Sequence, residues 1–130
     1  MDKPYHLSLK AVVAAARKAI EDGTLQALNT RERDSAICEY ETTIRGKVCV
    51  CAIGAAMPPD LRQREDFRNK GISSLLDNEW FTSDAPHELS LLQSDHDLWV
   101  GCRADYGASA AEYQERQFMD RLAEFERNVS

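Results

Sequence analysis

The chain has 130 residues, 43% of them hydrophobic, and a formal net charge of −6 at neutral pH. This length predicts a single domain over residues 1–130, large enough to bury a core without disulfides. The acidic balance argues against direct contact with nucleic acid, because phosphate binding requires a basic face. No apolar run reaches the roughly 20 residues that cross a bilayer, and the N-terminal segment lacks the pattern of a secretory signal. We therefore expect a cytoplasmic protein without membrane association.

Hydrophobic periodicity predicts about four or five helices. Ser8 is suited to cap the first of them, because its hydroxyl can accept a bond from a backbone N–H group. Gly101 is expected to end the helix that contains His96. Ser109 and Glu112 have the spacing of a capping box for the last helix. The expected helices cover residues 8–22, 24–28, 71–77, 83–100 and 109–127.

The segment between the second and third of these helices has the alternation of a β-hairpin. Residues 36–43 form the first strand, with Cys38 and Tyr40 on one face, and residues 47–52 return after a turn at Arg45-Gly46. A lone hairpin is marginally stable in water, so it must pack on the helices. The predicted fold class is therefore α+β, a mostly helical single domain packed on a short antiparallel hairpin.

A densely charged run follows the hairpin. Residues 60–70 mix both signs of charge, which is typical of a solvated excursion from the domain. Polar excursions on compact domains often bind partners, so this run is also the candidate contact surface. Its candidate binding residues are Arg62, Arg64, Asp66 and Arg68.

Four cysteines and His96, which interrupts an apolar helix face, are the residues that could carry chemistry. Zinc takes four sulfur or nitrogen ligands, and a hairpin with a helix can supply them. However, Cys49-Val50-Cys51 has CxC spacing, whereas metal-binding knuckles have CxxC. The favoured interpretation is that the thiols are small core residues, and no cofactor is expected. The weak metal-ligand candidates are Cys38, Cys49, Cys51, His96 and Cys102.

Cys51 and His96 are also weak candidates for a catalytic thiol–imidazole pair. Cys51 ends a strand where a helical turn begins, and the amides at such a turn favour a thiolate. Asp97 follows His96, but neighbours on a helix point about 100° apart, so Asp97 cannot easily orient the ring. An enzyme is therefore the less favoured class. The favoured role of His96 is a hydrogen bond to a backbone carbonyl or to the Tyr40 hydroxyl that fixes the hairpin on the helix.

The stretch from Cys38 to Trp99 resembles a family of small proteins of phages, prophages and proteobacteria. The pattern C-x-Y, C-A-[VI]-G, P-D and L-Q-x-x-H-D is present at residues 38–40, 51–54, 59–60 and 92–97. The chain departs from it in the doubled Pro58-Pro59 and in the additional Cys49 and Cys102, which weakens a metal site built on those two cysteines. The resemblance carries no activity and implies a mobile-element accessory protein in a bacterial cytoplasm. It also implies a joint role, as a structural knot or as a site, for Cys38, Tyr40, Cys51, Gly54, His96 and Asp97.

Size, acidity and this resemblance together favour a protein that binds and inhibits a host or defence protein complex, in the manner of anti-CRISPR proteins. An acidic surface can occupy a basic nucleic-acid channel of such a complex. The expected partner is therefore a protein, without direct binding to nucleic acid. The alternatives are a thiol-dependent enzyme or a small zinc-binding protein that uses Cys51 and His96.

Overall fold

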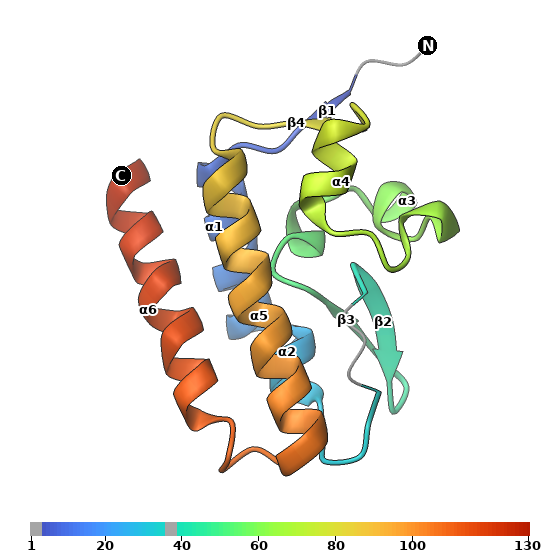
Figure 1. The fold of residues 1–130 in the computed structure, drawn as a ribbon, viewed down its shortest axis with the longest axis vertical. Coiled ribbons are helices and arrows are strands. Elements are labelled where there is room, and N and C mark those ends of the chain that lie inside the picture. Colours follow the sequence, from blue (N-terminus) through green and yellow to red (C-terminus); the bar gives the residue numbers. More distant parts are fainter. Residues whose placement is uncertain (1–3, 36–38) are drawn as a thin grey trace.

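Three long helices lie side by side, and a β-hairpin packs at one flank of them (Figure 1). The helices are α1 (Leu9–Glu21), α5 (Pro86–Tyr106) and α6 (Glu112–Val129), and the hairpin consists of β2 (Glu41–Ile44) and β3 (Lys47–Val50). The computed structural model describes residues 4–35 and 39–130. Its shorter elements are β1 (Tyr5–His6), α2 (Gln26–Asn29), the 3₁₀ turn η1 (Gly54–Ala56), α3 (Pro59–Arg62), the 3₁₀ turn η2 (Glu65–Phe67), α4 (Ile72–Asp77) and β4 (Phe81–Thr82).

Helix α1 begins and ends where the sequence predicts. The Ser8 hydroxyl accepts the Ala11 N–H at 3.1 Å, and the Asp84 carboxylate accepts the Leu9 N–H at 3.0 Å. Two of the four free amides at this helix start are thereby satisfied. In the second half of α1, Arg17 forms a two-point ion pair with Glu126 of α6, at 2.6 and 3.1 Å. That contact lowers the pKa of the Glu126 carboxyl and ties the first helix to the last.

Helix α5 is longer than the sequence predicts. Gly101 does not end it; the helix continues to Tyr106 and stops before Gly107, whose φ of +90° suits glycine. A glycine inside a helix costs only about 1 kcal/mol, and burial of Trp99, Val100 and Ala104 outweighs that cost. The expected capping box is also wrong, because α6 starts after Ala111 and has no side-chain cap.

The hairpin confirms the predicted α+β class, with shorter strands than expected. Glu41 pairs with Val50 and Ile44 with Lys47 around Arg45 and Gly46, both of which have the positive φ of a type I′ turn. Residues 36–38, part of the expected first strand, lie outside the described residues. The hairpin is not isolated, because the Val50 N–H donates to the Thr24 carbonyl at 2.9 Å.

A second strand pair was not expected from the sequence. Strands β1 and β4 run parallel, with Tyr5 opposite Phe81 and His6 opposite Thr82. Each has only two residues, which is too short for a visible alternation of polar and apolar side chains. This pair holds the N-terminal segment against the entrance to α5.

One hydrophobic core joins the helices and the hairpin. The Trp99 and Phe118 rings, 5.6 Å apart, fill the contact between α5 and α6. Among the described residues, no helix combines the length and the apolar character needed to cross a membrane. The largest fully buried side chains include Trp99, Phe67, Phe81, Phe118, Leu25 and Ile53.

Gly54 marks the closest backbone approach at the exit of the hairpin. A Cβ atom at this position would lie 2.1 Å from the Tyr40 carbonyl oxygen and 2.8 Å from its carbon. No side chain larger than hydrogen fits there, and the obstacle is backbone that cannot rotate away. The same Tyr40 carbonyl accepts the Cys51 N–H at 3.3 Å, so the start of the hairpin and its exit are in direct contact.

We therefore expect Gly54→Ala to lower the free energy of unfolding by about 3 kcal/mol or more, because the added methyl group overpacks a backbone contact. Gly101→Ala is the matched control. It adds the same methyl group in a helix with no atom within 4 Å, and should stabilise by about 0.5–1 kcal/mol. Urea unfolding followed by circular dichroism measures both changes. Equal effects of the two substitutions would contradict the close approach.

Candidate functional site

The charged excursion, residues 60–70, is held against the body of the protein. It contains η2 and all of α3 except its first residue, and its Phe67 side chain is only 1% exposed. The Phe67 ring packs on Trp80 at 5.3 Å and on Phe81 at 5.8 Å between centroids. Most of its other residues are exposed, as expected of a solvated segment, but one aromatic residue anchors its centre in the core.

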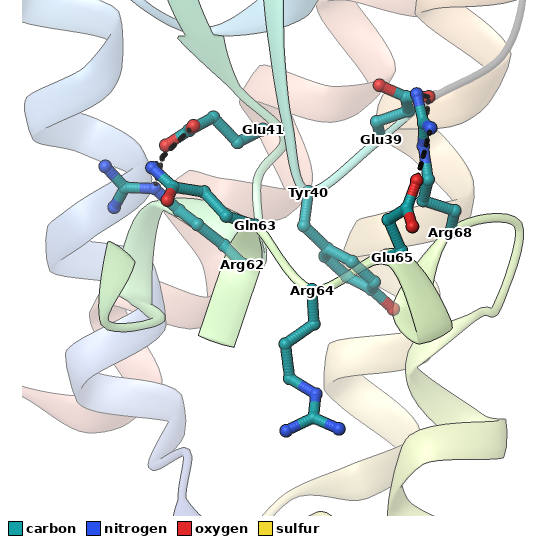
Figure 2. Close-up of a pocket in the computed structure, with 8 residues that line it drawn as sticks. All are labelled: Glu39, Tyr40, Glu41, Arg62, Gln63, Arg64, Glu65 and Arg68. Carbon is teal, nitrogen blue, oxygen red and sulfur yellow. Dashed lines mark hydrogen bonds and ion pairs between the residues drawn. The ribbon is translucent and has the colours of Figure 1, made fainter. Parts of the chain in front are cut away.

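Ion pairs fasten the excursion to the hairpin in two clusters on either side of Tyr40, as Figure 2 shows. In the first, Arg62 Nε donates to Glu41 Oε1 at 2.7 Å, and Gln63 donates to the other Glu41 oxygen at 2.9 Å. Arg62 also donates to the Met57 carbonyl at 3.2 Å, and both members of its ion pair are mostly buried. Arg62 therefore connects the excursion to β2.

The second cluster joins Arg68 to Glu39 at 3.1 Å and to Glu65 at 3.7 Å. Arg64 points away from both clusters (Figure 2) and forms a two-point pair with Asp66 at 2.7 and 2.9 Å. This hydrogen-bonded pair lowers the pKa of the Asp66 carboxyl and raises that of Arg64. All four candidate binding residues of the excursion therefore already have partners within the chain.

The pocket between the two clusters is small, with a volume of about 180 Å³. Sites for small molecules usually measure about 300–1,000 Å³ and are mostly apolar. Here the lining is charged, and its arginines pair with the neighbouring carboxylates. The arrangement suits a rigid, polar contact surface better than a substrate site.

Tyr40 connects the hairpin with the far end of the excursion. Its hydroxyl donates to the Lys70 carbonyl at 2.7 Å. Gln93 of α5 lies beside the same hydroxyl, at 3.5 Å, and its amide oxygen accepts the Ile72 N–H at 2.8 Å. Gln93 was not predicted as a site residue, although it belongs to the L-Q-x-x-H-D pattern. Its role depends on a contact with Tyr40, which is 53 residues away in the sequence.

Cys51 and Gly54 form a tight buried turn beside Tyr40. The Gly54 N–H points at the Cys51 sulfur at 3.1 Å, and the cysteine is only 1% exposed. These three members of the predicted motif do lie together. Cys38, the fourth expected at this place, lies outside the described residues.

His96 is fully buried, and its Nε2 atom accepts the Ala27 N–H of α2 at 3.3 Å. Its ring lies 5.8 Å from the Phe118 ring between centroids. This bond fastens α5 to α2, and the expected bond of His96 to a backbone carbonyl or to the Tyr40 hydroxyl stays a prediction. Asp97 Oδ1 lies 3.7 Å from His96 Nδ1, which is beyond hydrogen-bond range.

Within residues 4–35 and 39–130, no group of three or more histidine, cysteine or acidic side chains is arranged to hold a metal ion. Cys49 is buried, which raises the pKa of its thiol, and its sulfur faces the Lys47 carbonyl at 3.6 Å. The Cys102 sulfur lies on α5, 3.7 Å from the Ala110 carbonyl. The described metal-ligand candidates therefore do not converge.

The opposite side of the excursion carries a larger feature, which sequence reasoning missed. We call it the aromatic groove: a groove of about 990 Å³ whose lining includes Tyr5, Pro58, Asp60, Leu61, Glu79 and Trp80. Tyr5 and Trp80 are each 40% exposed. Phe81, the next residue, is only 1% exposed, so the two adjacent aromatic side chains face opposite ways. Only the polar neighbours Asn78 and Glu79 hinted that Trp80 faces outward.

No family model, no curated protein and no solved structure matches this chain. The resemblance of residues 38–99 to the phage and prophage pattern thus stays a prediction.

Thiol accessibility separates a structural from a reactive Cys51. We expect brief alkylation by iodoacetamide at pH 7.5 to modify Cys102, which is partly exposed, at least about tenfold faster than the buried Cys49 and Cys51. Peptide mapping by mass spectrometry reads each cysteine separately, and the urea-unfolded protein is the control in which all react. Rapid labelling of Cys51 in the folded protein, slowed by His96→Ala, would instead favour the thiol enzyme.

Proposed function

We propose that this protein acts by binding another protein, through the excursion and the aromatic groove beside it. The observation that carries the proposal is the outward position of Tyr5 and Trp80, each 40% exposed in one groove. Tyrosine and tryptophan are enriched at protein interfaces and often dominate their binding energy. Exposed aromatic side chains that gather in a groove are unusual on a surface without a partner.

The construction of the excursion supports this role. Arg62 pairs with Glu41, Arg68 pairs with Glu39, and Phe67 is inserted into the core. A surface that is ordered before binding loses less conformational entropy when a partner docks. The excursion is therefore suited to present its shape and side chains to a partner.

The charge distribution favours a basic partner. Six of the eleven arginine side chains form ion pairs with carboxylates of the chain, while the chain as a whole carries −6. The paired arginines are Arg17, Arg45, Arg62, Arg64, Arg68 and Arg121. In its specific form, the proposal is a phage- or prophage-encoded inhibitor, like an anti-CRISPR protein, that occupies a basic surface of a host or defence complex. The sequence resemblance supports this form.

The thiol enzyme is the less favoured alternative. Its two reactive groups, Cys51 and His96, are 1% and 0% exposed, so a substrate cannot reach them without rearrangement of the core. Each also makes a hydrogen bond that joins neighbouring elements. A structural role explains both observations.

Binding through the groove predicts that Trp80→Ala loses a partner that the wild-type chain retains. We would immobilise the protein and pass over it a nuclease-treated bacterial lysate from a strain with an active CRISPR–Cas system. Tyr113→Ala is the matched control, since Tyr113 is an aromatic residue on α6, 63% exposed and outside the groove. The expected result is one basic protein or complex retained by wild type and Tyr113→Ala, and reduced at least about tenfold on Trp80→Ala, as for an interface hot spot.

Retention of the same proteins on all three columns, or of none, would contradict the proposal. The specific form has its own readout, the DNA binding of the retained complex in a gel-shift assay. An inhibitor that occupies the nucleic-acid channel should abolish that binding when added in excess. Unchanged DNA binding would overturn the inhibitor and leave a protein-binding role.

A further inference from the structure

We infer that the aromatic groove binds an arginine-bearing segment of the partner, with the guanidinium on the Tyr5 and Trp80 rings and its charge beside Asp60 and Glu79. This inference rests on the proposed function and specifies the chemistry of the partner. It is carried by a ring–guanidinium contact already present in the groove and by the acidic residues that line it.

A contact within the chain shows that the Trp80 ring of the groove accepts a guanidinium group. The guanidinium of Arg64, which also lines the groove, lies over the Trp80 ring at 4.4 Å and near the Phe67 ring at 5.2 Å from the centroids. A cation over an aromatic face is attracted by the negative face of the ring, most strongly for tryptophan. Trp80 nevertheless remains 40% exposed, so part of its surface is available to a second group.

Tyr5 is held next to Trp80 by the backbone. The Tyr5 N–H donates to the Trp80 carbonyl at 3.2 Å, and the Tyr5 ring packs edge-on against the buried Phe81 ring at 6.2 Å. Tyr5 lies in β1 and Trp80 directly precedes β4, so a backbone hydrogen bond holds the two exposed rings together and they need little ordering when a ligand binds. Rigid aromatic side chains give contact area at low entropic cost.

The charges along the groove favour a cation. Asp60 and Glu79 are exposed carboxylates in its lining, while the charge of Arg64 is balanced by its two-point pair with Asp66. Lys70 is the opposing charge, since it also lines the groove. The two carboxylates outnumber this lysine, and the net charge of −6 adds a long-range attraction for basic segments.

Arginine fits this site better than lysine. Its guanidinium is planar, stacks on aromatic rings and is weakly hydrated, whereas the lysine ammonium is a strongly hydrated point charge. A carboxylate can also hold a guanidinium through two parallel hydrogen bonds. Stacking and pairing together thus discriminate between two residues of equal charge.

The test uses two acetylated and amidated heptapeptides in a glycine–serine background, one with two arginines and one with two lysines. Binding is followed by tryptophan fluorescence, which reports on the exposed Trp80 because Trp99 is buried. We expect the arginine peptide to bind at least about fivefold more tightly than the lysine peptide. For the variants, binding of the arginine peptide is followed by amide chemical shifts. Trp80→Ala and Tyr5→Ala should weaken this binding, whereas Tyr113→Ala should not.

Charge variants keep the test independent of folding, because they alter exposed residues only. The double variant Asp60→Asn/Glu79→Gln should weaken binding of the arginine peptide by at least about tenfold at low salt, and Lys70→Ala should tighten it. Equal affinity for both peptides, no binding, or shifts outside the groove would overturn the inference. So would saturation of the groove by a second copy of the chain, detected as concentration-dependent dimerisation.

Competition distinguishes failure of this inference from failure of the proposed function. Release of the lysate partner by the arginine peptide, but not by the lysine peptide, supports both. A partner that stays bound at saturating arginine peptide overturns the inference and leaves protein binding intact. Peptide binding without any retained partner overturns the proposed function alone.

Discussion

The contact between Gly54 and the Tyr40 backbone is the constraint on which the rest of the structure depends. It presses the exit of the hairpin against its entrance, so the excursion must begin at a defined place. The Tyr40 hydroxyl then donates a hydrogen bond to the Lys70 carbonyl, where the excursion ends. One residue therefore contacts both the exit of the hairpin and the end of the excursion, and Phe67 anchors the middle of the excursion.

This arrangement divides the molecule into a scaffold and a contact surface. The sulfur of Cys51 and the imidazole of His96 belong to the scaffold, where each accepts a backbone N–H and is shielded from water. The surface features are the charged pocket between the two ion-pair clusters and the aromatic groove, both beside the excursion. A protein so built is suited to recognition, which requires a preformed surface rather than a reactive centre.

Sequence patterns predicted the local features well. Ser8 caps α1, and Arg45-Gly46 turns the hairpin, because both depend on a few adjacent residues. Gly101 was misjudged because burial of its neighbours outweighs a small helix penalty.

The candidate site was only half visible from the sequence. The burial of Phe67 was not predicted, because charged residues surround it in the sequence. Its burial depends on contacts with Trp80 and Phe81 on another segment. The aromatic groove brings Tyr5 beside Trp80 across 75 residues of chain, and no periodicity within a single element encodes such a contact. Likewise, the position of His96 on an apolar face predicted its burial, but its partner on α2 depends on tertiary packing.

Hydrogen exchange on Tyr40→Phe tests most directly whether the Tyr40 side chain holds the end of the excursion in place. The substitution removes only the hydroxyl that holds Lys70, so we predict a loss of about 1 kcal/mol in unfolding free energy. Protection should fall selectively at the amides of Phe67, Lys70 and Leu75, relative to α1 and α6, while Tyr113→Phe changes nothing. An even loss of protection over the whole chain, or no loss in the excursion, would contradict the claim that Tyr40 holds it in place.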